Sequence, residues 1–250
     1  MMPITLLLTC EHGGNHIPQR YTHLFTSRRA QQALSSHRGY DLGALFIARA
    51  LSKSLHAPLH AASVSRLLLD LNRSTHHPAL FSEFSKNLSE TEKRALLQRY
   101  YLPHREAVQQ AISQQISTNH IVWHIAVHSF TPTLNGEQRH ADIGLLYDPK
   151  RKAEQLLCLQ WQHALQTLHP TLRIRRNYPY RGNADGFTTA LRRQFPAASY
   201  LGIELEMNQA LIARATPQRQ RLSNMLVASL CRLIKASLSH RHTRLKTSPT

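Results

Sequence analysis

Residues 6–18 have the sequence LLLTCEHGGNHIP, in which a short apolar run ends at an acid, a histidine and two glycines. The apolar run at 4–9 is typical of a buried strand. A Gly-Gly pair marks a sharp turn or a close approach of other backbone. Because α/β proteins bind ligands beside the carboxyl ends of their strands, we expect Glu11 and His12 to face a functional site.

Further strand and helix patterns alternate along the rest of the chain. Strands are expected at 59–64, 66–71, 121–127, 143–147, 172–176 and 199–207, and helices at 41–55, 89–118, 150–168, 189–194 and from Pro217 onward. This alternation predicts a three-layer α/β fold, with a mixed, mostly parallel sheet and helices on both faces. Residues 1–240 are assigned to one domain and 241–250 to a basic flexible tail.

The chain is strongly basic, with 31 Lys and Arg against 14 Asp and Glu in 250 residues and a formal net charge of +17. Such a balance permits binding to nucleic acid or to a small anionic substrate. The basic residues are scattered and no nucleic-acid motif appears, which argues against a nucleic-acid partner. No run reaches the roughly 18 apolar residues that a membrane span needs. Because no signal-peptide pattern begins the sequence, we expect a cytoplasmic protein without a membrane partner; homo-oligomerisation stays open.

The cysteines are three, widely spaced and in apolar surroundings, which favours buried structural thiols over a disulfide or a metal pair. Cys10 adjoins the expected site, so a nucleophilic role is an alternative. No other feature of the sequence supports that alternative.

Reactive side chains gather where the predicted strands end. They are Glu11 and His12, Asn72 and Arg73, His128 and Ser129, and Glu204 and Glu206. Strand ends of like direction meet at one edge of a parallel sheet, so His12 and His128 are a natural pair of zinc ligands. A catalytic zinc takes a third protein ligand, here a carboxylate, with Asp41 and Glu11 as the candidates. A single histidine is more often structural, so the prediction depends on this co-occurrence.

Other charged residues suit a hydrolytic site. Glu204 and Glu206 alternate along one strand and face the same side, where either could act as a general base toward a water. Arg66 and Arg73 offer fork-shaped donors for a substrate carboxylate. Asp70 lies between them and is as suited to pairing as to contact with substrate.

Several short motifs together resemble the N-formylglutamate amidohydrolase family. In order they are CEHGGNHIP at 10–18, HRGYD at 37–41, SR at 65–66 with DLNR at 70–73, AVHSF at 126–130, NYPYRG at 177–182 and EMNQ at 206–209. The family is similar to zinc carboxypeptidases and aspartoacylases. The resemblance implies a zinc-carboxypeptidase-like fold with one zinc ion per chain, and covers residues 5–210.

The resemblance also implies roles for individual residues. It implies His12, Asp41 and His128 as metal ligands and Glu206 as the general base, because EMNQ fits the family's Glu-x-x-Gln. The substrate-binding residues that it implies are Arg66, Asn72, Arg73 and Tyr180. Asn15 stands where carboxypeptidases have a glutamate ligand, so Glu11 stays the alternative third ligand. NADG at 183–186 replaces the Gly-His expected in formylglutamate hydrolases proper.

These features predict a zinc-dependent hydrolase that cleaves the amide of an N-formyl or other N-acyl amino acid, such as N-formylglutamate. A carboxypeptidase-like or aspartoacylase-like zinc hydrolase is the nearest alternative. A basic nucleic-acid-binding protein is the alternative from another class.

Overall fold

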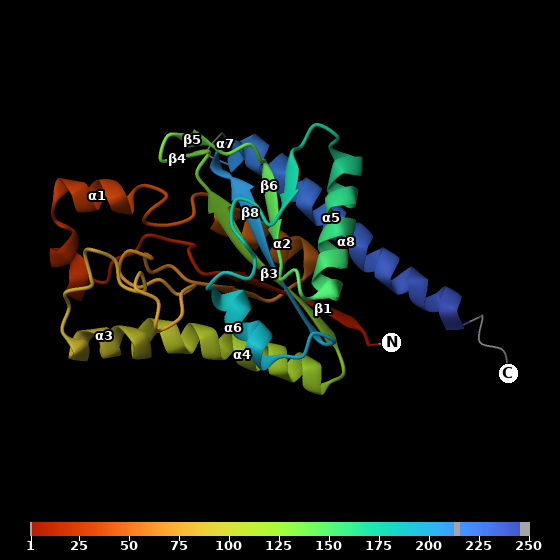
Figure 1. The fold of residues 1–250 in the computed structure, drawn as a ribbon, viewed down its shortest axis with the longest axis horizontal. Helices are drawn as coiled ribbons and strands as arrows, with labels where there is room; N and C mark the ends of the chain where they lie inside the picture. Colours follow the sequence, from red (N-terminus) through yellow and green to blue (C-terminus); the bar gives the residue numbers. More distant parts are fainter. Residues whose placement is uncertain (1, 213–215, 246–250) are drawn as a thin grey trace.

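The computed structural model describes residues 2–212 and 216–245, and it confirms the three-layer α/β fold (Figure 1). A six-stranded sheet has the order β2-β1-β3-β8-β6-β7. Its strands are β1 (Ile4–Cys10), β2 (Leu59–Ala61), β3 (Ile121–Phe130), β6 (Ile143–Leu146), β7 (Ile174–Arg176) and β8 (Tyr200–Asn208). Strand β6 is antiparallel to β8 and the other pairs are parallel, as the mixed-sheet prediction requires.

Helices cover both faces of this sheet. The helical elements are η1 (Gln19–Phe25), α1 (Arg28–Leu34), α2 (Ala44–Leu55), α3 (Glu90–Leu96), the π-helical turn η2 (Leu97–Tyr101), α4 (Leu102–Ser117), α5 (Lys152–Leu168), α6 (Phe187–Gln194), α7 (Gln209–Ile212) and α8 (Thr216–Leu245). Helices α2, α5 and α8 cover one face, and α4 and α6 cover the other. Two short strands, β4 (Thr133–Leu134) and β5 (Glu137–Gln138), form a separate hairpin.

The side chains of β1 alternate between two cores, one on each face of the sheet. Leu6, Leu8 and Cys10 point into the core beneath α2, α5 and α8, whereas Leu7 points into the core on the α4 side. Burial raises the pKa of the Cys10 thiol well above its usual value, which disfavours the thiolate. Cys10 is therefore a core residue, and the nucleophilic alternative lacks support.

Two expected elements differ from the structure. Residues 66–71 form turns and not a strand, because the N–H groups of Leu68 and Leu69 bond back to Ser65 O and the leucines pack into a second core. Strand β2 ends at Ala61, three residues before the predicted end. The helix predicted at 89–118 begins with a capping box between Ser89 and Glu92, and α3, η2 and α4 continue from it to Ser117.

The residues beside the sheet edge are placed by backbone contacts. Asp41 precedes helix α2 and does not begin it, because the helix starts at Ala44 behind Gly43, which has φ +77°. The Asp41 N–H donates to His12 O at 2.9 Å and joins the two segments. A Cβ on Gly14 would lie 2.6 Å from Ser63 O, so this glycine admits the neighbouring loop.

The ends of the chain bear on two further predictions. Helix α8 continues to Leu245, and residues 246–250 of the predicted basic tail lie outside the described residues. The division into a domain at 1–240 and a tail at 241–250 stays a prediction. None of the described helices is long and apolar enough to cross a membrane.

Candidate active site

His12 is the second residue after the end of β1 and lies at the carboxyl edge of the sheet. Its Nε2 atom lies 2.7 Å from Asp70 Oδ1, and because an ionised carboxylate can only accept, Nε2 carries the proton. Its Nδ1 atom is buried and has no hydrogen-bond partner among the described residues. A buried ring nitrogen without a partner is costly, so Nδ1 is available to a ligand such as a metal ion.

His128 lies near the end of β3, which pairs with β1. Its Nδ1 atom lies 2.9 Å from Asp41 Oδ2, and its Nε2 atom lies 3.2 Å from Glu11 Oε2. The two imidazole rings are 5.2 Å apart, centroid to centroid. Both histidines therefore direct Nδ1 toward Asp41 and Nε2 toward a second carboxylate.

The carboxylate of Asp41 lies between the two histidines. Its Oδ2 is 3.5 Å from His12 Nδ1 and accepts from Ser129 N at 3.3 Å, while Arg66 Nη1 lies 3.4 Å from Oδ1. Although burial alone would raise it, the imidazoles of His12 and His128 hold the pKa of Asp41 well below its usual range. Asp41 is thus a buried and ionised carboxylate.

His12, Asp41 and His128 form a group whose ligand atoms all lie within 4.8 Å of one another. Two imidazole nitrogens and a carboxylate oxygen are a known ligand set of catalytic zinc sites, so these residues fit a zinc ion. Glu11, the alternative third ligand, contacts His128 at Nε2, the ring nitrogen that faces away from Asp41. The structure does not bring Glu11 into this group.

Asp70 contacts His12 at Nε2, the ring nitrogen that faces away from Asp41. It accepts from His12 at Nε2, from Arg66 Nη2 at 3.0 Å and from Asn72 N at 3.0 Å. Although burial opposes it, the Arg66 and His12 charges hold the pKa of Asp70 well below its usual range. The sequence leaves the role of Asp70 open between pairing and substrate contact, and the structure shows pairing.

Glu206 lies on β8 in register with His128, so the two side chains share one face of neighbouring strands. The residue is 5% exposed, and its Oε2 has no hydrogen-bond partner within the described part of the chain. Burial raises the pKa of Glu206 to about 8, against the opposing effect of the His128 imidazole. Glu204 differs, because its Oε1 accepts a hydrogen bond from the Thr188 hydroxyl.

All of the predicted site residues line one cavity of about 190 Å³. They are His12, Asp41, Arg66, Asn72, Arg73, His128, Tyr180 and Glu206. Arg181 and Ser129, for which the sequence predicts no role, also line the cavity. Their positions in the sequence could have indicated them, because Arg181 is next to Tyr180 and Ser129 is next to His128.

The substrate-binding candidates in this cavity are partly engaged with the protein. Asn72 Oδ1 accepts from Phe187 N at 2.7 Å, and Arg73 Nη1 donates to Asp185 O at 2.9 Å. Arg66 contacts both Asp41 and Asp70, and its side chain is 26% exposed. These contacts fix the donors in place at the cavity wall.

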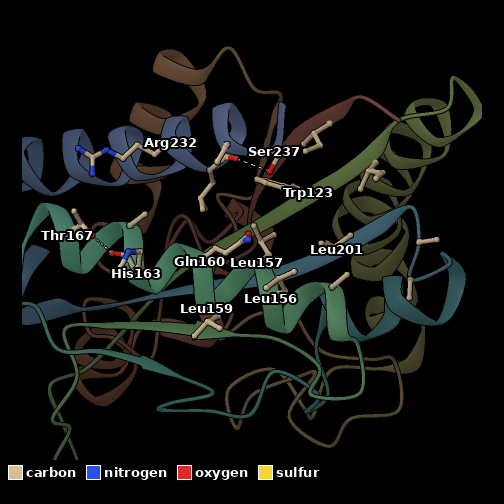
Figure 2. A pocket seen from close by; sticks show the side chains of 18 residues that line it. Trp123, Leu156, Leu157, Leu159, Gln160, His163, Thr167, Leu201, Arg232 and Ser237 are labelled. Carbon is tan, nitrogen blue, oxygen red and sulfur yellow. Dashed lines mark hydrogen bonds between the residues drawn. The ribbon is translucent and has the colours of Figure 1, made fainter. Parts of the chain in front are cut away.

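A larger groove of about 850 Å³ lies on the other side of the molecule, between α5 and α8 (Figure 2). Its lining is mostly apolar, from residues such as Trp123, Leu156 and Leu201, and its titratable residues are His163 and Arg232. Because catalysis needs converging polar groups, the smaller cavity is the candidate active site.

Comparisons with known proteins show the family and the fold of this chain. The family model for N-formylglutamate amidohydrolase matches residues 4–213. The chain is 30% identical to the gene product Atu2144 from Agrobacterium tumefaciens, with 91% of each chain covered and a TM-score of 0.75. An N-formylglutamate amidohydrolase from Ralstonia eutropha is 18% identical over 94% of each chain, with a TM-score of 0.70, and shares the fold. No curated protein matches the sequence.

Proposed function

Because this chain belongs to the N-formylglutamate amidohydrolase family and is an amidohydrolase, we propose that it hydrolyses the amide of an N-formyl or other N-acyl amino acid, such as N-formylglutamate, with one zinc ion. The observation that carries the proposal is the buried group of His12, Asp41 and His128 at the wall of the cavity that also contains Glu206.

The proposed roles divide the chemistry between the metal and the chain. When bound by His12, Asp41 and His128, zinc supplies a Lewis acid that polarises the acyl oxygen and lowers the pKa of a water. Glu206 takes the proton of the attacking water and passes it to the amine nitrogen as the C–N bond breaks. The products are the carboxylic acid, formate for a formyl group, and the amino acid.

The amino acid's carboxylate is proposed to bind Arg66 and Arg73, with Asn72 and Tyr180 beside them. A guanidinium has five N–H donors, so the bond from Arg73 to Asp185 leaves further donors for substrate. Binding at a remote carboxylate orients the reacting amide against the catalytic groups.

The size of the cavity favours a small substrate over the alternatives. At about 190 Å³ it is below the roughly 300–1,000 Å³ of pockets that hold drug-sized ligands. A single acylated amino acid suits that space better than a long peptide or a nucleic-acid strand. Its anionic carboxylate also suits the arginines of the wall.

A cytoplasmic location, inferred from the sequence, belongs to the same proposal.

Removal and return of metal tests the zinc requirement. The protein is stripped with a chelator, and formate release from a panel of N-formyl amino acids is measured before and after one equivalent of zinc is added. We expect activity to be lost and then restored. N-acetyl amino acids and dipeptides, assayed by release of the free amino acid, distinguish the aspartoacylase-like and carboxypeptidase-like alternatives.

The His128→Ala variant tests the ligand assignment. It removes one nitrogen of the three-residue group, so we expect loss of bound zinc and at least a 100-fold loss of activity. Full activity in this variant would sink the zinc proposal. Tight, salt-sensitive DNA binding by the inactive variant would instead favour the binding protein.

A further inference from the structure

Glu11 is a buried carboxylate to which the proposed mechanism gives no role. It is 1% exposed, and its oxygens lie 3.2 Å from His128 Nε2 and 3.6 Å from His104 Nε2. Neither oxygen forms a hydrogen bond of good geometry with any described residue. A buried carboxylate costs several kcal/mol unless neighbouring groups compensate it, and here the two imidazoles are its ion-pair contacts.

Each of the two histidines has a carboxylate near Nε2, hydrogen-bonded for His12 at 2.7 Å and within ion-pair distance for His128 at 3.2 Å. Each directs Nδ1 toward Asp41, and each has a buried carboxylate at Nε2: Asp70 for His12 and Glu11 for His128. A carboxylate on the non-ligating nitrogen of a metal-binding histidine fixes the tautomer and the orientation of the ring.

We propose that Glu11 is a positioning residue that holds His128 with Nδ1 toward the metal, and that His104 holds Glu11 in turn. This inference rests on the proposed zinc site. It also assigns a role to the acid next to His12 that differs from direct ligation.

His104 extends the arrangement from the sheet to the helix layer. It lies on α4, its side chain is 9% exposed, and its Nε2 is buried without a hydrogen bond among the described residues. Its ring also packs 5.9 Å from the Phe187 ring on α6. Helix α4 thus fixes the position of Glu11, and through it the orientation of His128.

Zinc affinity, measured by competition with a coloured chelator, tests this inference without using activity. In E11Q the amide keeps the shape of the side chain but loses the charge. We expect its zinc dissociation constant to rise about 10–100-fold, the usual effect of losing such a partner. H104Q should show a smaller rise, because Glu11 then keeps its contact with His128.

E204Q is the matched control, since it also removes one glutamate charge from the neighbourhood of the site. Glu204 contacts Thr188 and no member of the metal group, so we expect a clearly smaller change than in E11Q. The visible absorption of the cobalt-substituted protein should shift in E11Q, because the donor strength of His128 changes, and should match wild type in E204Q.

Three results would overturn the inference. The first is an unchanged zinc affinity in E11Q, and the second is a loss of zinc affinity in E204Q equal to that in E11Q. The third is a loss of zinc affinity above 1,000-fold in E11Q, which would make Glu11 itself a ligand. Wild-type protein that binds no zinc would overturn the proposed function as well, so the two failures are distinguishable. If E11Q does not fold, E11D keeps the charge at a shorter reach and should also weaken zinc binding.

Discussion

Glu206 and Glu204 are two residues apart on β8 and line the same cavity, but their oxygens have different surroundings. Glu204 accepts from Thr188, whereas Glu206 keeps a buried oxygen without a hydrogen bond in the described structure. Burial raises the pKa of Glu206, and a cation bound beside it would lower that pKa. The unengaged oxygen beside His128 supports the proposal of Glu206, and not Glu204, as the general base.

Exchange of each glutamate for glutamine separates the two. We expect E206Q to lower kcat by about 10²–10⁴-fold, the usual contribution of general acid–base catalysis, while zinc content stays at one per chain. E204Q keeps the proposed base and should lose less than tenfold. Steady-state formate release with metal analysis measures both variants. Equal losses in kcat would contradict the assignment of Glu206.

At the residue scale the sequence predicts the groups that lie on or just after strands. His12 and His128 follow or end apolar runs, and a parallel sheet brings such ends together whatever the loops do. The contacts of Asp70 with His12 and of His104 with Glu11 were not predictable in this way. Asp70 reaches His12 because 66–71 folds into turns, and His104 reaches Glu11 because α4 packs on the sheet. Both contacts depend on tertiary packing.

At the scale of elements, the short strand β6 brings one wall of the cavity into place. Gly144 pairs with Glu206 on β8, and a Cβ on it would lie 2.0 Å from Tyr178 O. The loop that carries Tyr180 therefore crosses β6 at the one position without a side chain. Asn177 anchors this loop, because its Oδ1 accepts from Tyr147 N and Gly182 N.

The Gly144→Ala variant tests this crossing. Because its methyl group overlaps the Tyr178 carbonyl, we expect the free energy of unfolding to fall by about 1–3 kcal/mol. We also expect weaker substrate binding, measured as a raised KM. Thermal unfolding and steady-state kinetics measure the two effects. Gly186→Ala is the control, since its nearest neighbour would lie at 3.4 Å, an ordinary contact. A Gly144→Ala protein as stable as this control would contradict the tight crossing.

The error at 66–71 shows where local pattern stops being informative. The run LLLDL has the apolar density of a buried strand, and it is indeed buried. Its backbone hydrogen bonds differ from those of a strand, because the N–H groups of Leu68 and Leu69 donate back to Ser65 O. The strands predicted at 4–9 and 121–127 are present as β1 and β3, and each pairs along its length with a neighbouring strand. The segment at 66–71 has none within the described sheet.

At the scale of the whole molecule, the metal group joins segments that are far apart in the chain. His12 follows β1, Asp41 precedes α2 and His128 lies on β3, so an ion bound by them would stabilise the packing of all three segments. Ligand that binds the folded state alone adds about 2.7 kcal/mol at 100 times its dissociation constant. For a chain of this size, that corresponds to roughly 5–10 °C in Tm.

Thermal unfolding of stripped protein, with and without zinc, measures this stabilisation. We expect a rise of that order for wild type and none for His128→Ala. Magnesium at the same concentration serves as a control, because it prefers oxygen ligands and should shift Tm little. A zinc-induced rise that persists in His128→Ala would indicate binding elsewhere.

The crossing of the 177–182 loop over β6 has a further consequence for how such proteins diverge. His12, Asp41 and His128 all lie within residues 12–128. Tyr180 lines the same cavity from a later loop, beside strand β6, which runs antiparallel to β8. Replacements in that segment can change the shape of the cavity without moving His12, Asp41 or His128. Inherited variation among relatives with different preferences should therefore concentrate at 178–186, while the hydrolytic apparatus stays under separate constraint.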